Sequence, residues 1–276
     1  MKKIFNYLLK QFFILKAVAF VTYKEWAAYR SHMLISLFVG PIQFLVQVFI
    51  WKAVFINRSV INNFSLKQMI TYYAVATLIH YLIMDFADWN LHMLIHTGRF
   101  VTYMIRPLSH RYFAFSQKVG HRVLGFLWEF IPVCCMFIFI FRINLIPVNI
   151  GWTFCSILLG FIMTYLINYC IGISGFWLIR AEGVRRMIQL FSMLFKGVFI
   201  PLVFFPKIFQ KILFFLPFQF AIYVPIRVFI GSYELAGYNL KIPEIVAIQA
   251  IAVLIMFFIS GFLWSLGVKK FTGVGV

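Results

Sequence analysis

The chain has 276 residues, of which 63% are hydrophobic and 12% are charged, and its mean hydropathy is +0.95. Soluble globular proteins are about half apolar and about a quarter charged, so this composition excludes an ordinary soluble domain and predicts a polytopic membrane protein. Lysine and arginine outnumber aspartate and glutamate by 25 to 7. These cations lie beside apolar segments, as expected if positively charged loops face the cytoplasm. This distribution argues against binding to nucleic acid, which needs a basic patch on a soluble surface.

Residues 1–30 place lysines among aromatic and aliphatic residues at near-helical spacing. We expect an interfacial helix that lies on the cytoplasmic leaflet, with its apolar face among the acyl chains of membrane lipid and its lysines near anionic headgroups. The alternative is a solvated tail, which would leave Phe12, Phe13 and Trp26 in water.

Apolar runs long enough to cross a bilayer, which takes roughly 20 residues, follow in order along the chain. Segments 31–51, 152–179 and 245–268 contain 21, 28 and 24 residues without a charged side chain. We therefore predict an all-α fold in which the whole chain, 1–276, is a single transmembrane domain. The six predicted spans are 31–56, 67–87, 123–141, 152–179, 187–202 and 245–268.

The segment 88–122 is basic and polar, so we expect it to be a cytoplasmic loop between the second and third spans. Within it, Gly98 and Pro107 bracket a stretch that can form about two helical turns and can sit in a cleft on a soluble partner. His92 and His96 have a spacing that can hold a metal, but a third ligand is not evident. We interpret them as solvated loop histidines and predict no metal site.

Two charged residues, Glu129 and Lys196, lie well inside predicted spans and not near their ends. Such residues are costly in a membrane and are functional candidates by default. About six residues separate Glu129 from Arg122, a rise of about 10 Å, so we favour pairing with a cation near the interface over a substrate or proton role. Lys196 either faces a polar cavity or lies elsewhere because the register of its span is shifted.

Four of the nine prolines interrupt the apolar stretch 196–231. An internal proline removes a helical hydrogen bond and clashes with the preceding turn, so this stretch cannot be one straight helix. We predict that 203–231 forms broken, re-entrant half-helices between the fifth and sixth spans. Lys207 and Lys211 would share one face of a short amphipathic helix there. The prolines are Pro201, Pro206, Pro217 and Pro225.

Two stretches resemble the ABC type 2 exporter permeases. The order I-P-L, F-P, an amphipathic piece, L-P-F and a final glycine, within 196–231, is similar to the last but one membrane helix of that family and its pair of extracellular half-helices. The words H-T-G-R-F-V-T-Y-M-I-R-P-L-S, at 96–109, resemble the loop of a subgroup in which a glycine is followed, after seven positions, by R-P. In that subgroup the loop is a coupling helix, here about 97–107, that docks onto the ATPase. The matching residues are Gly98, Arg99, Phe100, Tyr103, Met104, Ile105, Arg106 and Pro107.

The resemblance implies a permease subunit of an ATP-binding cassette exporter. Such exporters contain two permease halves, formed by the same or different chains, and cytoplasmic ATPase subunits that bind ATP and Mg²⁺. None of the 16 glycines is followed by lysine, so a Walker A loop for ATP phosphates is absent. We therefore expect a transport subunit without catalytic residues or a cofactor of its own, and not an enzyme.

Six spans, with 16 of the 25 cations on the same side as the termini, predict that both termini are cytoplasmic and that the protein lies in the cell membrane, plasma or inner. The alternative function is an ion-coupled secondary transporter or a membrane assembly protein that acts without ATP. In a secondary transporter Glu129 and Lys196 would be the candidate coupling groups.

Overall fold

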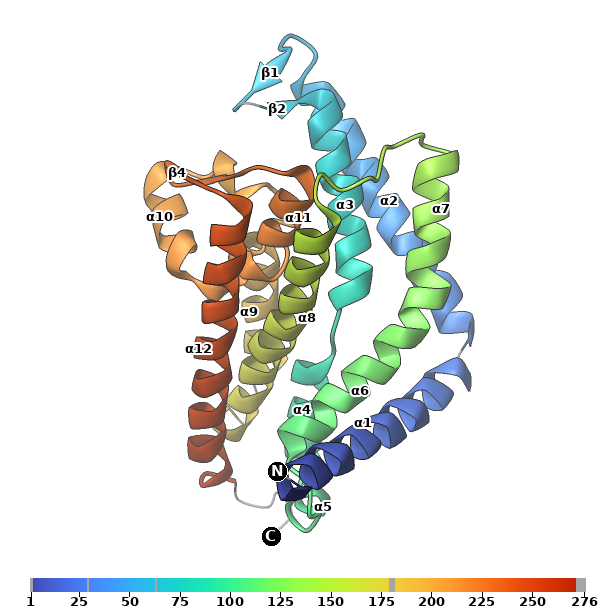
Figure 1. Cartoon of the computed structure of the whole chain (residues 1–276), viewed down its shortest axis with the longest axis vertical. Coiled ribbons are helices and arrows are strands. Elements are labelled where there is room, and N and C mark those ends of the chain that lie inside the picture. The colour runs from blue at the N-terminus through green and yellow to red at the C-terminus, as the bar shows by residue number, and fades with distance from the viewer. Residues whose placement is uncertain (1, 29, 63, 179–181, 272–276) are drawn as a thin grey trace.

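The computed structural model describes residues 2–28, 30–62, 64–178 and 182–271. Helices dominate, and most of the long ones run along the long axis of the molecule (Figure 1), in agreement with the predicted all-α membrane fold. The α-helices are α1 (Lys2–Ala28), α2 (Arg30–Val54), α3 (Leu66–Ile83), α4 (Ala87–His96), α5 (Val101–Met104), α6 (His110–Gly125), α7 (Ile131–Phe139), α8 (Ile150–Ile173), α9 (Glu182–Phe195), α10 (Lys207–Phe215), α11 (Tyr223–Ile230) and α12 (Ile242–Val268).

Shorter elements join these helices. The strands among the described residues form two antiparallel hairpins, β1 with β2 and β3 with β4. The π-helical turn η1 (Phe126–Phe130) makes α6 continuous with α7. The remaining short elements are η2 (Ser174–Phe176), η3 (Leu202–Phe204), η4 (Pro217–Phe220), β1 (Val60–Ile61), β2 (Phe64–Ser65), β3 (Tyr233–Leu235) and β4 (Tyr238–Leu240).

Within the described ranges, four helices are long and apolar enough to cross a membrane, and a fifth crossing results if α3 and α4, bent by 41°, count as one span. The six expected spans are therefore not all reproduced. The predicted span 187–202 overlaps α9, which has 14 residues and ends at Phe195. The four candidate spans are Leu34–Val54, His110–Phe139, Ile150–Phe176 and Ile242–Val268.

The third candidate span starts earlier than the expected segment 123–141. Helix α6 begins at His110, where the hydroxyl of Ser109 accepts a hydrogen bond from the backbone N–H of Tyr112 at 3.3 Å and caps the helix. Much of the segment 88–122 is thus helical and not a solvated loop. Lys118 and Arg122, which made this segment look water-exposed, are buried on α6 because each meets a carboxylate, at 3.9 and 3.3 Å.

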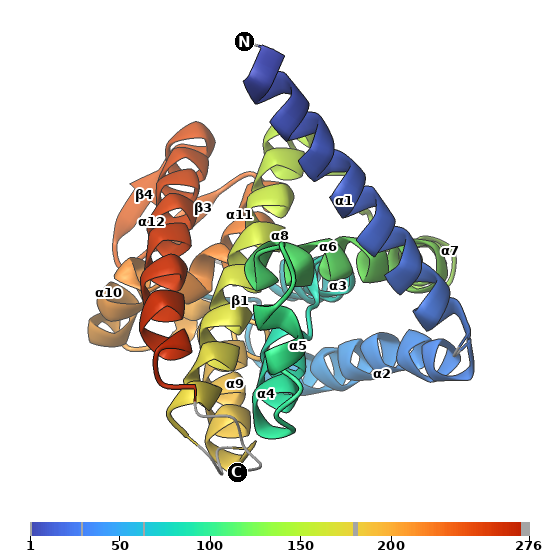
Figure 2. The ribbon, with the colours of Figure 1, turned by 90° about the horizontal axis from the view of Figure 1, so that it is seen from below.

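Two glycines allow close helix contacts at the lower end of the molecule. A Cβ atom added to Gly120 of α6 would lie 2.2 Å from the carbonyl oxygen of Ala19 in α1. One added to Gly172 of α8 would lie 3.0 Å from Cβ of Leu91 in α4. These contacts hold α1 across the underside of α6, as Figure 2 shows, and fix α4 against α8.

Buried polar side chains connect the helices of the core. The hydroxyl of Tyr72 in α3 donates to the carbonyl of Gly197 at 2.7 Å and so holds the turn after α9. The side-chain amide of Gln249 in α12 donates to the carbonyls of Ser156 in α8, at 3.0 Å, and of Phe220 in η4, at 2.8 Å. Because buried polar groups are costly unless paired, these bonds specify how the helices fit together.

The proline-rich stretch is broken into η3, α10, η4 and α11. Pro206 precedes α10 and Pro217 opens η4, positions where a missing backbone N–H costs nothing. Gln210, buried on α10, donates to the carbonyls of Val203 and Phe205 and accepts from the backbone N–H of Ala236. These bonds attach α10 to η3 and to the hairpin β3–β4, at the end of the molecule opposite α5 (Figure 1).

Candidate functional site

The connection between α4 and α6 is a tight and largely exposed segment at one end of the molecule (Figure 1). Gly98 has a φ of 70°, a left-handed conformation that favours glycine, and it turns the chain into α5. That helix has four residues, Val101–Met104, about one turn and not the two expected. Exposed apolar and cationic side chains cover its outer side. We define this docking face by Arg99, Val101, Met104, Ile105, Arg106 and Pro107.

Phe100 and Tyr103 point toward the body of the protein. Phe100 is 2% exposed, and its ring centroid lies 5.3 Å from that of Phe176 and 5.6 Å from that of Trp264. The guanidinium of Arg106 lies 4.5 Å from the centre of the half-buried Tyr103 ring. Of the residues predicted to dock, Phe100 therefore anchors the segment to the protein, whereas the residues of the docking face are exposed.

A cavity of about 470 Å³ lies where α3, α4, α8 and α9 meet. The break between α3 and α4 brings Asp85 and Asp88 to its wall. Arg185 and Gln189, both on α9, donate to Oδ2 of Asp88 at 2.5 and 2.7 Å. Nζ of Lys118 on α6 lies 3.9 Å from Oδ2 of Asp85. Because these ion pairs are almost fully buried, each carboxylate depends on its partner for stabilisation.

Glu182 extends this charge network to the surface at the start of α9. Its Oε1 accepts hydrogen bonds from Arg185 at 2.8 Å and from Arg186 at 2.9 Å. These bonds lower the pKa of the Glu182 carboxyl to about 2. Since this pKa is lowered, the contacts stabilise the folded state fully at pH values above the ordinary pKa of glutamate. This stabilisation is lost as the pH falls to the lowered pKa of about 2.

Glu129 lies in η1, is 2% exposed and is paired. Its Oε2 lies 3.3 Å from Nη1 of Arg122, and the hydroxyl of Ser36 in α2 donates to its Oε1. Arg122 also donates to the carbonyl of Tyr81 at 2.6 Å. Glu129 thus pairs with a cation, as in the interpretation that we favoured from the sequence. It is not among the residues that line the cavity.

Lys196 directly follows α9 and is 7% exposed. Its side chain lines the same cavity as Asp85 and Asp88. Of the two interpretations that the sequence left open, this position matches a lysine that faces a polar cavity.

The candidate residues of the broken stretch lie elsewhere. Pro201 is buried and Pro217 half-buried, whereas Pro206, Lys207 and Lys211 are exposed. Lys207 lines a separate cavity of about 670 Å³ that also includes Arg227. The structure thus does not bring the two lysines of α10 to Lys196 or Glu129.

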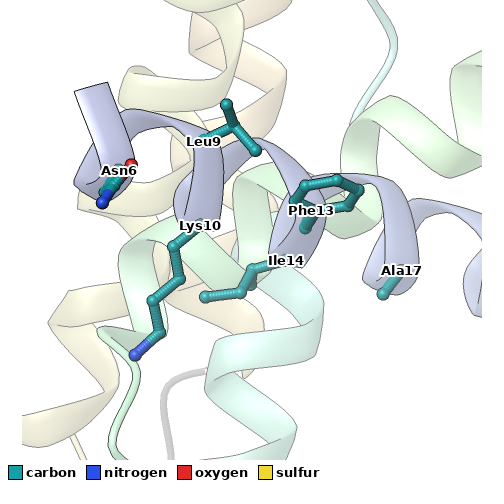
Figure 3. Close-up of a pocket in the computed structure, with 6 residues that line it drawn as sticks. All are labelled: Asn6, Leu9, Lys10, Phe13, Ile14 and Ala17. Atoms are coloured by element: carbon teal, nitrogen blue, oxygen red, sulfur yellow. The ribbon is translucent and has the colours of Figure 1, made fainter. Parts of the chain in front are cut away.

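A further hollow lies beside α1 (Figure 3). All of its lining residues belong to this one helix, so it lacks the opposing walls that enclose a ligand. We assign no ligand to it. The lining residues are Asn6, Leu9, Lys10, Phe13, Ile14 and Ala17.

The interpretation of His92 and His96 as solvated loop histidines is wrong, because both lie on a helix, with His92 buried and His96 half-buried. Both lie on α4 with ring centroids 4.2 Å apart, and His92 is 3% exposed because α4 packs against α8. Among the described residues, no group of three or more side chains could hold a metal ion.

Long apolar helices joined by short connections define a multi-pass integral membrane protein. The family model described as "ABC-2 family transporter protein" matches residues 41–275, and the chain belongs to this family. The resemblance to ABC-2 permeases is thereby confirmed, and the family is a membrane component of transport and not an enzyme. Searches of curated proteins and of solved structures find no match.

The sequence reasoning missed the charged residues of the cavity wall as candidates. Asp85, Asp88 and Arg185 were not singled out there, because each lies at or beyond the end of an apolar run. Each of these acids lies at the end of an apolar run and has a cation partner far along the chain. A search for opposite charges at the ends of neighbouring apolar runs would have paired them.

Proposed function

We propose that this chain is the permease half of an ATP-binding cassette exporter, coupled to separate cytoplasmic ATPase subunits and paired with a second permease half. The docking face carries this proposal, because apolar side chains flanked by arginines on a segment anchored by Phe100 suit a cleft on a soluble protein. Membership of the ABC-2 family supports it. ATP and Mg²⁺ would bind to the partner, because this chain has no phosphate-binding loop.

We also propose that the chain belongs to the subgroup of permeases in which a glycine is followed, after seven positions, by R-P. The helices would lie in the plasma or inner membrane of the cell, with the docking face in the cytoplasm. Figure 1 shows α1, α5 and the end of α12 at one end of the molecule. Of the 16 cations that we counted on this side, Lys118, Arg122 and Arg185 are in buried ion pairs. The proposed orientation therefore rests on the other cations of this side. Those described as exposed are Lys10, Lys16, Lys24, Arg99, Arg106, Arg186, Lys269 and Lys270.

Helix α1 fits an interfacial position in this arrangement. Its outer surface exposes Phe12 and Phe13, 63% and 58%, together with Lys10, Lys16 and Lys24. Aromatic rings beside lysines on one exposed helix suit the boundary between acyl chains and anionic headgroups.

We further propose that α9 and the residues that follow it as far as 202 supply the remaining crossing, and that 203–231, which includes α10, η4 and α11, re-enters the membrane from the outer side. The exposed apolar residues of α10 support this placement, since Ile208 is 73% and Phe215 80% exposed. Surfaces of this kind suit acyl chains better than water.

Purification of the chain from its native membrane in mild detergent, followed by protein identification and an ATP hydrolysis assay, tests the proposed function. We expect a co-purifying ATPase with a Walker A sequence and vanadate-sensitive activity. A chain that purifies without any ATPase, and without nucleotide-dependent activity, would instead favour an ion-coupled carrier or an assembly protein.

The charge reversal Arg106→Glu is expected to weaken binding of the ATPase roughly 10-fold or more, because it replaces one of the two arginines that flank the apolar docking face with an acid. Lys211→Glu, the same change on exposed α10 at the opposite end, is the matched control. Both variants are compared by the amount of ATPase that co-purifies. Equal recovery with wild type and Arg106→Glu would contradict the assigned docking face.

A further inference from the structure

The charges around the cavity between α3, α4, α8 and α9 do not balance. Three carboxylates belong to this network, from Asp85, Asp88 and Glu182. Lys118, Arg185 and Arg186 form ion pairs with them, and Lys196 is a fourth cation on the cavity wall. With three acids and four cations, the network carries one surplus positive charge.

The surplus charge is located at Lys196. Every carboxylate of the network already has a cation within 4.0 Å, and within the described part of the chain none of these ion pairs includes Lys196. No hydrogen-bond partner of its ammonium group is found there either. The Lys196 side chain is only 7% exposed. It shares the cavity wall with Asp85 and Asp88 but has no carboxylate in direct contact, and an ammonium group without a close partner is costly in a protein interior.

Two hydroxyl groups on the same wall also lack a partner in the described structure. Thr164 of α8 is 4% exposed and Ser192 of α9 is 2% exposed. Neither hydroxyl oxygen has a hydrogen-bond partner, although both residues line the cavity with Lys196. Buried polar groups are paired in nearly all proteins, so an ammonium and two hydroxyls around one hollow have the chemistry of an incomplete anion site.

We propose that this cavity binds an oxyanion of the phosphate type, held by the ammonium group of Lys196 and by hydrogen bonds from Thr164 and Ser192. The volume of about 470 Å³ lies within the roughly 300–1,000 Å³ typical of small-ligand sites. The oxyanion is either the headgroup of an anionic lipid or a free phosphate compound. Binding is a property of this chain alone and does not require the ATPase of the proposed exporter.

The test uses the purified full chain in a neutral maltoside detergent with two probes. Titration calorimetry measures binding of inorganic phosphate, and native mass spectrometry measures binding of phosphatidylglycerol. We expect the wild type to bind at least one probe and Lys196→Met to bind it roughly 10-fold or more weakly, because a charge-assisted hydrogen bond is lost. Lys196→Arg keeps the charge and should retain most of the binding.

Lys211→Met is the matched control, because it removes an exposed lysine that does not line this cavity, and it should bind as wild type does. Binding of phosphatidylglycerol without phosphate identifies a lipid headgroup as the ligand, whereas binding of phosphate identifies a free oxyanion. Failure of the wild type to bind either probe, or equal binding by Lys196→Met, overturns the proposal.

Thr164→Val with Ser192→Ala is a second variant that leaves every charge in place. It removes two unpaired hydroxyls, so it should fold and bind the same probe several-fold more weakly. It therefore decides the question if Lys196→Met does not fold. Equal recovery of the ATPase with Arg106→Glu and wild type, together with intact binding of the oxyanion, would count against the docking face of the proposed exporter and leave this site standing. Loss of the ATPase in Arg106→Glu, with no binding of either probe by the wild type, would count only against the site.

Discussion

Arg185→Met is expected to lower the free energy of unfolding by about 3–5 kcal/mol, the usual cost of breaking a buried ion pair by removing one partner. The side chain of Arg185 is 8% exposed and donates to Asp88 at 2.5 Å. Methionine fills similar space but leaves the Asp88 carboxylate, 1% exposed, with Gln189 as its remaining side-chain donor. Titration with SDS in mixed micelles measures the change.

Arg186→Met is the matched control for this prediction. Arg186 is the next residue and also binds Glu182, but its side chain is 73% exposed, so its loss should change stability little. Adding Asp88→Asn to Arg185→Met should recover part of the lost stability, because a neutral amide tolerates burial better than an unpaired carboxylate. Equal stability of Arg185→Met and wild type would show that the ion pair does not stabilise the fold.

Gly120→Ala is expected to separate α1 from α6 and to destabilise the protein by about 1–3 kcal/mol, the usual cost of overpacking. The new Cβ atom would lie 2.2 Å from the carbonyl oxygen and 2.7 Å from Cα of Ala19. These are backbone atoms, so a side-chain rotation cannot relieve the clash and α1 has to move. Hydrogen exchange in detergent should become faster in α1 and stay unchanged in α12.

Gly183→Ala provides the comparison, because it makes the same change in helix α9 with no atom within 4 Å of the new Cβ. It should stabilise the helix slightly, since alanine is a better helix former than glycine by about 1 kcal/mol. If Gly120→Ala behaves like Gly183→Ala, the close packing of α1 on α6 is not what holds α1 in place.

The sequence predicted the membrane class and the positions of the strongest spans because apolar runs of sufficient length have one physical explanation. It also predicted that prolines break the stretch after Lys196. It did not predict that α6 starts at His110, because Lys118 and Arg122 look water-exposed when their partners, Asp85 and Glu129, are not known to be near. Pairing between distant segments decides whether a cation is buried, and composition does not report it.

Some candidate residues could be predicted from the sequence and others could not, because the sequence does not show which distant segments lie together. Glu129 and Lys196 were found because a charge in an apolar run is conspicuous. Phe100 was counted with the docking residues, although it points inward, because the sequence pattern does not give the direction of a side chain in a short turn. Thr164 and Ser192 carry no sequence signal at all, since a hydroxyl in a span usually bonds to its own helix.

Helix α4 connects the docking face to the wall of the cavity. Its ten residues span about 15 Å, with Asp88 near one end and the docking face a few residues beyond the other. Beyond Asp88 the chain bends by 41° into α3. One short helix therefore joins the docking face to the Asp88–Arg185 ion pair, and through that pair to α9 and the wall of the cavity.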